Sequence, residues 1–429
     1  MTILQKTTTD TVLNQPEVNF GSKLQTGVLN QLLRNQLSPT IDNSVKPDSK
    51  ATNETTVISA LSAAVDAATE ILKTSQLDRT LLHEKLSQLY YVNKDVYDAL
   101  EIAPAMRKRQ FISKSGLVLS PNNSITTILD DLRVRAFIRG LDQAIKGKIA
   151  NHHGVVQIAY PACGPFAPLV LPLLAYYKAQ GCYTAQQLQV RLIDLQPGAI
   201  QTLDALVVEL GVQDYIAEIA LADALEYQSE VAFDLVVLEA MQHGLSREGQ
   251  LAIALHFSKQ LNEDGDFLPK KITVRGMIAS LQREFVEQWQ DAKEVSEAEI
   301  SRTINAERTI VGDILSITAD TLRKLNIHQL DENNALVECY SLMVPQLASD
   351  VEQTLLFCTE VIVWADERIG EYDSGITHPL PEQQICINFT PSKPLPGDLN
   401  VVSGDTLQFY YKLNGLPGFL ATVVEVNHE

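Results

Sequence analysis

The chain has 429 residues, 45% of them hydrophobic, and its 53 acidic side chains against 34 basic ones give a formal net charge of −19. This length exceeds one ordinary hydrophobic core, so we expect two domains or one elaborated domain. The acidic excess opposes the attraction to phosphate on which nucleic-acid binding depends, and it favours a basic or cationic partner.

The start of the chain and its cysteines predict a cytoplasmic protein. Polar and charged residues such as Gln5, Lys6 and Asp10 interrupt the few apolar ones at the start, so we expect no signal peptide. No apolar run approaches the roughly 18 residues of a membrane span. The five cysteines are odd in number and lack CxxC spacing, which indicates free thiols and no structural zinc site. They are Cys163, Cys182, Cys339, Cys358 and Cys386.

The first 150 residues divide into an irregular segment and a helical region. Residues 1–53 are rich in Thr, Asn, Gln and Ser, which predicts a mobile or irregular segment. Residues 54–150 contain apolar positions at helical spacing, first in VISALSAAVDAATEIL and then in LLHEKLSQLYYV, where Asp78 is a candidate N-cap. A third helix is expected from about Thr126 to Ile145, with Ser124 or Thr126 as its cap.

Residues 151–275 alternate strand and helix signals, which predicts a parallel sheet. The expected strands are VVQIAY, QVRLID, YIAEIA and FDLVVL. Gly181 and Gly211 should end the first two helices, since glycine readily adopts the left-handed conformation found there. After a last helix, GQLAIALHFSKQL, a turn at Gly265 should lead into KKITVRG.

The remainder of the chain changes character twice. Residues 276–330 include a charged, helix-favouring stretch in which Phe285 and Trp289 are spaced to pack on one face. In residues 331–429, the segments LVECYSLMV, LLFCTEVIVWAD, QQICINF, TLQFYYKL and FLATVVEV predict an antiparallel β domain.

Two glutamates, Glu239 and Glu248, follow the apolar strand FDLVVL and are nine positions apart. Carboxylates just past such a strand lie at the sheet edge where α/β proteins bind ligands. Two of them converging on one cavity suit a guanidinium, whose planar donors match carboxylate oxygens. The alternative is that both are solvated loop charges.

This order of domains, with several local motifs between about residues 124 and 426, resembles the protein arginine methyltransferases, as a divergent bacterial-type member. Glu239, Met241 and Glu248 resemble the family's loop for the substrate guanidinium, and His243 lies within it. Thr377-His378-Pro379 resembles a Thr-His-Trp element whose histidine supports the second glutamate, although the Trp is missing. DFLPKKITV is similar to the family's passage from sheet to barrel.

The resemblance also implies an S-adenosylmethionine site. Asp194, after QVRLI, would accept hydrogen bonds from the ribose, Asp223 would flank the adenine, and Tyr160 and Gly164 belong to the loop beside the methionine part. That loop, YPACGPFAP, has a single glycine where two or three are usual. Arg133 in DDLRVRAF resembles the residue that binds the cofactor carboxylate. Without the resemblance, Asp194 would be a helix N-cap or a solvated charge, Arg133 a surface or salt-bridge residue, and His243 an exposed loop histidine.

The architecture implied is a Rossmann-like methyltransferase domain with a helical N-terminal region, a helical dimerisation insertion and a C-terminal antiparallel β-barrel-like domain. The activity implied is S-adenosylmethionine-dependent N-methylation of a guanidino group, in free arginine, an arginine peptide or a small metabolite. Glu239 or Glu248 would accept the proton, with His378 as a relay, and Thr377 would contact the substrate. We expect a homodimer that binds neither nucleic acid nor a membrane. We also expect no metal site, since His152-His153 lacks a third ligand at suitable spacing. Two alternatives remain: a catalytically silent dimeric scaffold, and an enzyme with a different acceptor, by O- or C-methylation or cyclisation.

Overall fold

The computed structural model describes residues 59–73, 76–151, 154–280, 308–346, 353–380, 387–388 and 399–424. All described residues belong to one compact unit of the chain, within Asp42–Glu429. The expected irregular segment, the residues Phe285 and Trp289 and the thiol of Cys386 therefore lie outside the described residues.

Two long helices open the described chain, as the sequence predicts. They are α2 (Ala60–Lys73) and α3 (Arg79–Ala99), and the Asp78 side chain caps α3 by accepting a hydrogen bond from the Leu81 amide. The buried face of α2 consists of alanines and Ile71, and small side chains allow close approach to neighbouring helices. That face packs against α3 and against α7 of the next domain.

The third helix begins later than predicted. A short helix α4 (Pro104–Arg107), a hairpin of β1 (Phe111–Ile112) and β2 (Leu117–Val118), and α5 (Pro121–Ser124) precede a 3-10 turn, η1 (Ile125–Leu129). Helix α6 then spans Asp131–Asn151. Ser124 and Thr126 are not its caps, because their hydroxyls donate to the carbonyls of Ser120 and Asn123.

A five-stranded parallel sheet follows, in the order β5-β4-β3-β6-β7. Its strands are β3 (Val156–Pro161), β4 (Leu188–Asp194), β5 (Ile216–Leu221), β6 (Phe233–Val237) and β7 (Leu261–Leu268). Counted in chain order this is 3-2-1-4-5, the order of a Rossmann-like sheet. The predicted parallel sheet is therefore confirmed.

Helices connect these strands: α7 (Leu171–Gln180), α8 (Pro197–Glu209), the 3-10 turn η2 (Gln213–Tyr215) and α9 (Gln250–Phe257). Gly181 and Gly211 have φ of 64° and 65° after α7 and α8, as predicted. Gly265 is not a turn but lies inside β7, where a Cβ would come within 2.7 Å of the Phe233 carbonyl oxygen.

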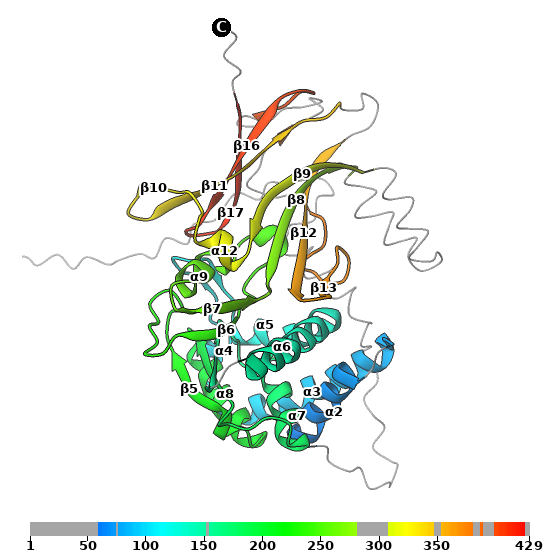
Figure 1. Cartoon of the computed structure of the whole chain (residues 1–429), viewed down its shortest axis with the longest axis vertical. Helices are drawn as coiled ribbons and strands as arrows, with labels where there is room; N and C mark the ends of the chain where they lie inside the picture. The colour runs from blue at the N-terminus through cyan, green and yellow to red at the C-terminus, as the bar shows by residue number, and fades with distance from the viewer. Residues whose placement is uncertain are drawn as a thin grey trace, which may run out of the picture. The chain divides into compact units, whose positions relative to one another are not determined.

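Two antiparallel sheets form the rest of the described chain (Figure 1). One has the order β13-β12-β8-β9, from β8 (Lys271–Ala279), β9 (Thr309–Ile317), β12 (Thr354–Trp364) and β13 (Glu367–Ile369). The other has the order β10-β11-β16-β17, from β10 (Ile327–Asp331), β11 (Asn334–Met343), β16 (Thr406–Lys412) and β17 (Gly418–Val423). The same region also contains the short helix α12 (Ala319–Leu322) and a parallel pair of strands, β14 (Ile387–Asn388) and β15 (Leu399–Asn400).

Two expectations for this region need correction. The described strands form two open four-stranded sheets and not one closed barrel. The expected helical insertion at 276–330 contains, where it is described, the end of β8, all of β9, α12 and the start of β10. The β-branched residues of β9 pair with β8, so this described part of the range is strand, while the charged helix-favouring stretch at 281–307 lies outside the described residues.

Helix α6 joins the parallel sheet to the antiparallel ones. It packs against β3, β6 and β7 on one side and against β12 and β13 on the other. Gly140 allows this approach, because a Cβ there would lie 2.7 Å from Val363 Cγ1. Arg139 Nε also donates to Glu367 Oε1 at 2.7 Å. One hydrophobic cluster runs from α2 through the parallel sheet to Phe409 and Phe419 of the β region.

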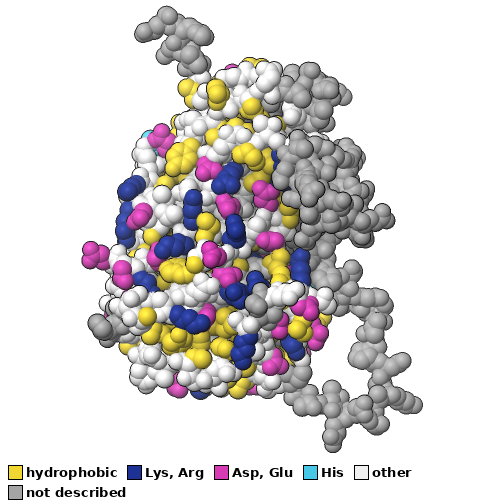
Figure 2. All heavy atoms as spheres, turned by 45° about the vertical axis from the view of Figure 1, so that its right-hand side comes forward, with side chains coloured by type: hydrophobic (Ala, Val, Ile, Leu, Met, Phe, Trp, Pro, Cys, Tyr) yellow, Lys and Arg dark blue, Asp and Glu magenta, His cyan; other side chains and the backbone are white. Residues whose placement is uncertain are grey.

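The molecular surface has no strong bias of charge on the face seen in Figure 2, where basic and acidic side chains are interspersed with small apolar areas. The helices among the described residues include none with the length and apolar character to span a membrane. The same residues contain no group of three or more His, Cys, Asp or Glu side chains arranged to hold a metal ion. Their four cysteines are free thiols.

Candidate functional site

The residues singled out in the sequence gather at the carboxyl edge of the parallel sheet. The chain leaves β3 and β6 in loops that flank the point where the strand order reverses, and sheets of this kind bind ligands in the crevice at that point. Tyr160 lies near the end of β3, Gly164 belongs to the loop after that strand, and Glu239 lies in the loop after β6.

The loop after β3 turns sharply although it contains only one glycine. Ala162, Gly164 and Ala167 have positive φ values of 52°, 67° and 37°. The buried Asp194 carboxylate at the end of β4 stabilises this turn, because Oδ2 accepts the Gly164 amide at 2.9 Å and Oδ1 accepts the Gln196 amide at 2.8 Å. Burial raises the pKa of Asp194, although these backbone amides act in the opposite direction. Asp194 is neither exposed nor the residue at the N-cap of α8, which is Gln196.

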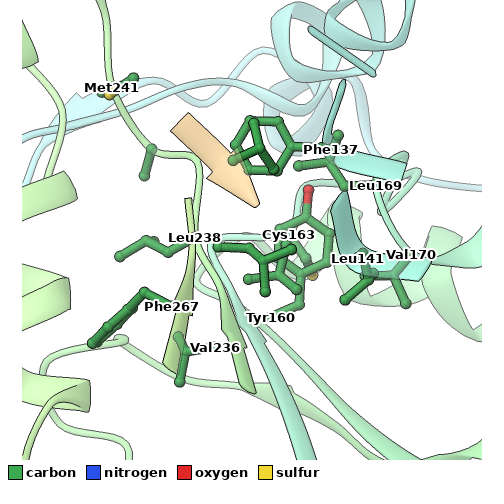
Figure 3. Packing of buried hydrophobic residues seen from close by; sticks show 14 of the residues in the cluster. Phe137, Leu141, Tyr160, Cys163, Leu169, Val170, Val236, Leu238, Met241 and Phe267 are labelled. Atoms are coloured by element: carbon green, nitrogen blue, oxygen red, sulfur yellow. The ribbon is translucent and has the colours of Figure 1, made fainter. Parts of the chain in front are cut away.

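Tyr160 lies beneath this loop with its hydroxyl directed toward Phe137 and Leu169 (Figure 3). Only 3% of it is exposed. Burial raises the pKa of the phenol well above its ordinary value, and the nearby Cys163 and Glu239 act in the same direction. The phenol therefore stays protonated at neutral pH, which makes it a hydrogen-bond donor and not a base.

Asp223 follows β5 at the same edge of the sheet. The Ala222 amide donates to the Asp194 carbonyl oxygen at 3.1 Å, which places the two acidic residues in adjacent segments. Asp223 is half-buried, and its Oδ1 accepts the Leu225 amide at 2.9 Å.

Arg133 on α6 is bound to Glu239. Its NH1 donates to Glu239 Oε2 at 2.8 Å, and its NH2 donates to the Thr127 carbonyl at 2.7 Å. Asp130 lies 3.4 Å from its Nε. Burial of the Arg133 guanidinium acts to lower its pKa. The Glu239 and Asp130 carboxylates outweigh this effect and raise the pKa of Arg133, with a smaller contribution from Glu248. The site thus contains a permanent cation among three carboxylates.

The loop from Glu239 to Glu248 is closed at its base by Gln250, the first residue of α9. The buried Gln250 side chain accepts the Ala240 amide at 2.8 Å and donates to the Leu238 carbonyl at 3.0 Å. Near the other end, Gln242 Nε2 donates to Glu248 Oε1 at 3.0 Å. The reading as a solvated loop charge is wrong for Glu239, which is 11% exposed and bound to a buried arginine, while Glu248 is half-buried.

The same loop has a strained backbone. Leu245 and Arg247 have φ of 57° and 67°, values that few non-glycine residues adopt. The antiparallel region holds them there. Tyr411 Oη donates to the Leu245 carbonyl at 2.6 Å, and the Arg247 amide donates to the Pro417 carbonyl at 2.8 Å. The Gly244 amide donates to Thr359 Oγ1 at 2.9 Å.

Met241 and His243 point inward from this loop. They are 2% and 3% exposed, so the reading of His243 as an exposed loop histidine is wrong. Met241 belongs to the hydrophobic cluster, as Figure 3 shows, and it has no described contact that marks it for a substrate. His243 lies close enough to His378 to lower the pKa of that residue.

Thr377 and His378 lie in the segment after β13. Thr377 is fully buried, and its hydroxyl donates to the Gly370 carbonyl at 2.5 Å. His378 is 1% exposed, with its ring edge-on to Tyr372 at 4.9 Å between centroids. Burial lowers the pKa of His378 to about 3, helped by the nearby charges of His243 and Arg308. The imidazole is therefore neutral at physiological pH.

Sequence reasoning missed the residues that connect these parts. Ser374 Oγ donates to Asp130 Oδ2 at 2.6 Å, which ties the Thr377-His378 segment to the carboxylate beside Arg133. Gln250 and Tyr411, described above, fix the glutamate loop. The acidic doublet in DDLRVRAF was the one available signal, because two carboxylates just before Arg133 suggest an ion pair within reach of that residue.

Comparisons with known proteins add a distant likeness. No family model matches the sequence, and no curated protein matches it. One similar structure is a Trypanosoma brucei PRMT1 enzyme-prozyme heterotetrameric complex with AdoHcy, at 15% identity and a TM-score of 0.37, covering 69% of this chain and 92% of that one. Another is Arabidopsis thaliana protein arginine methyltransferase 10, at 11% identity and a TM-score of 0.34, covering 64% of this chain and 84% of that one. Likenesses this distant do not identify the family or the reaction, and neither structure is bacterial.

Proposed function

We propose that this protein is an S-adenosylmethionine-dependent N-methyltransferase that acts on a guanidino group, in free arginine, an arginine peptide or a small guanidino metabolite. The observation that supports this proposal is the loop from Glu239 to Glu248 at the edge of a Rossmann-like sheet. Its backbone is strained, and hydrogen bonds to Tyr411, Thr359 and Pro417 hold it in place. Evolution retains strained backbone mainly where a site needs it.

The charge of the site suits a cationic acceptor. Glu239, Glu248 and Asp130 are three formal anions around Arg133, and one guanidinium among them leaves an excess of two negative charges. Arg133 neutralises part of the charge of Glu239 and fixes its orientation. A guanidinium bound between Glu239 and Glu248 would then lower the electrostatic energy of both carboxylates.

The residues at the edge fit the cofactor. The Asp194 carboxylate accepts two backbone amides, and a carboxylate has about four acceptor positions, so it retains capacity for ribose hydroxyls. Arg133 Nε is buried and makes no hydrogen bond within the described part of the chain, although Asp130 Oδ2 lies 3.4 Å away, and the Arg133 guanidinium is the cation that would attract the carboxylate of the methionine part. Tyr160 and Gly164 would border that part, and Asp223 the adenine.

The chain's own residues would bind, orient and deprotonate the acceptor. The bound cofactor supplies an electrophilic methyl group on a sulfonium. Glu239 and Glu248 would hold the guanidinium so that one nitrogen faces this group, since positioning provides most of the rate in such a transfer. A guanidinium is a weak acid, so Glu248 would accept the proton released. With a pKa of about 3, His378 is a poor proton relay, and we propose that it supports the loop as a neutral group.

The test replaces each glutamate by Gln, which keeps the shape and removes the charge. We expect Glu239→Gln and Glu248→Gln to reduce methyl transfer by orders of magnitude while cofactor affinity changes little, and the double variant to be hardly worse than the worse single one. The exposed Glu209 on α8 provides the control Glu209→Gln. Mass spectrometry with labelled cofactor would measure transfer to free arginine, guanidino acids and Arg-rich peptides. Near-normal transfer by both single variants would favour an acceptor without positive charge.

A silent scaffold is the second candidate, and the loop after β3 is the observation that favours it. Ala162 and Ala167 adopt left-handed conformations where glycine is more favourable, so this loop is less adapted to close approach of a ligand. Calorimetry with S-adenosylmethionine and S-adenosylhomocysteine separates the two candidates, because the enzyme must bind them and the scaffold need not.

A further inference from the structure

The hairpin β1–β2 contacts the glutamate loop directly. The Leu117 amide donates to the Arg247 carbonyl at 2.7 Å, and the Gly415 amide donates to the Lys114 carbonyl at 3.0 Å. Arg247 in turn donates to Pro417, as described above. Three segments, 113–117, 247–249 and 415–417, therefore meet through backbone hydrogen bonds, and we call them the loop junction.

Gly116 lies against the backbone of Glu248 in this junction. Its φ is +149°, and an added Cβ would stand 2.7 Å from the Arg247 carbonyl oxygen, 2.8 Å from the Glu248 carbonyl carbon and 3.0 Å from Glu248 Cα. Real Cβ atoms do not approach backbone so closely, and backbone atoms cannot rotate away as a flexible side chain can. A side chain at position 116 must therefore push the hairpin turn and the backbone at Glu248 apart.

The hairpin also lies against the residue after Glu248. A Cβ on Gly249 would lie 3.1 Å from both Ser115 Cβ and Ser115 Oγ and 3.2 Å from Ile253 Cδ1. Ser115 and Gly116 are both buried. The hairpin turn thus contacts the chain at positions 247, 248 and 249, and it restricts movement of the Glu248 backbone.

We propose that Gly116 is a positioning residue for Glu248, and that the hairpin turn sets where this carboxylate stands in the acceptor site. The proposal rests on the proposed function of Glu248. A misplacement of about 1 Å in a reacting geometry can cost about a hundredfold in rate, so the absence of a side chain at position 116 has a direct catalytic consequence.

The first test compares Gly116→Ala with Gly404→Ala. Gly404 has φ of +93° and nothing within 4 Å of an added Cβ, so it controls for backbone strain without the contact. We expect Gly116→Ala to lose about a hundredfold in kcat for methyl transfer, with cofactor Kd unchanged within about twofold. Gly404→Ala should resemble the unmodified protein. A crystal structure of Gly116→Ala with Glu248 Cα in its original place would overturn the proposal.

A second test applies if Gly116→Ala does not fold. Gly249→Ala introduces a milder conflict with Ser115, and Ser115→Gly removes the atoms that it meets. We expect transfer to fall in Gly249→Ala and to recover at least in part when Ser115→Gly is added to it. A double variant as impaired as Gly249→Ala would show that contact with the hairpin does not position Glu248.

Glu248→Gln serves as the reference in both tests. Loss of transfer in Glu248→Gln but not in Gly116→Ala would reject the role of Gly116 and leave the proposed function intact. Normal transfer in both Glu239→Gln and Glu248→Gln would reject the proposed function itself, whatever the behaviour of Gly116→Ala.

Discussion

The neutral imidazole of His378 gives the folded protein a pH dependence of its own. Its pKa is about 3 in the folded state, mainly through burial, whereas a histidine in an unfolded chain titrates near 6.5. Between these values the unfolded chain binds a proton that the folded chain does not. This contribution to stability is thus fully present above about pH 6.5 and is lost as the pH falls toward 3.

We expect His378→Gln to flatten the dependence of unfolding free energy on pH between about 3 and 6.5. The slope removed should approach 1.4 kcal/mol per pH unit, the value for one proton. His328, whose side chain is 47% exposed, provides the control His328→Gln. Urea denaturation at a series of pH values measures both, and equal slopes in the two variants would contradict the assignment.

Asp194 should affect both the cofactor and the loop. Because its carboxylate accepts the Gly164 and Gln196 amides, Asp194→Ala removes an ordered acceptor as well as the ribose contact proposed for it. We expect cofactor affinity to fall about tenfold to a hundredfold, since a hydrogen bond to a charged group contributes about 1.5 to 3 kcal/mol. Calorimetry measures this, with the exposed Asp204→Ala as control. Unchanged affinity would remove Asp194 from the cofactor site.

At the scale of single elements, strand β16 supports the glutamate loop through one hydroxyl. Tyr411→Phe removes the donor to the Leu245 carbonyl and leaves that buried oxygen without this partner. We expect a loss of about 1 to 3 kcal/mol in unfolding free energy and a fall in methyl transfer, because Leu245 is held in a strained conformation. Tyr340→Phe on β11, where the residue is 56% exposed, is the control. Full activity in Tyr411→Phe would mean that the loop keeps its shape without β16.

The sequence predicted the elements whose signal is local. Buried parallel strands such as β6 are continuous apolar runs, and Gly181 and Gly211 mark helix ends by their conformational freedom. The hairpin β1–β2 was missed because strands of two residues have no periodicity. Strand β9 was assigned to a helical insertion because its pairing with β8 is set by tertiary contacts.

The contacts of the candidate site also divide into those with a local sequence signal and those without one. The glutamate pair was visible because both residues follow one strand in sequence. The Arg133–Glu239 ion pair was not predicted, since its two residues are 106 positions apart in the sequence. The Ser374–Asp130 contact spans 244 positions, and no local pattern predicts such a pair.

At the scale of the whole molecule, α6 couples the parallel and antiparallel sheets. Gly140→Ala should lower the unfolding free energy by about 1 to 3 kcal/mol, because its Cβ would lie 2.7 Å from Val363 Cγ1. Gly147→Ala, on the same helix with nothing within 4 Å, should raise it by about 0.5 to 1 kcal/mol through helix propensity. Chemical denaturation compares the two. Equal effects would show that α6 does not pack tightly on β12.

The quaternary state remains a prediction. We expect a homodimer, formed through the segment between β8 and β9, of which residues 281–307 lie outside the described chain. Light scattering at micromolar concentration measures the mass directly, and a value near 47.4 kDa would show a monomer.

The Arg139–Glu367 pair joins residues that are 228 positions apart, and this has a consequence for biosynthesis. At about 5 to 20 residues per second, a ribosome needs roughly 10 to 45 s to make the chain between them. During that time α6 exists without the strands that cover its far side, so the nascent chain exposes an apolar surface. We expect stalled chains that end before β12 to be cleaved by protease near α6 and to bind chaperones, whereas the released protein resists both.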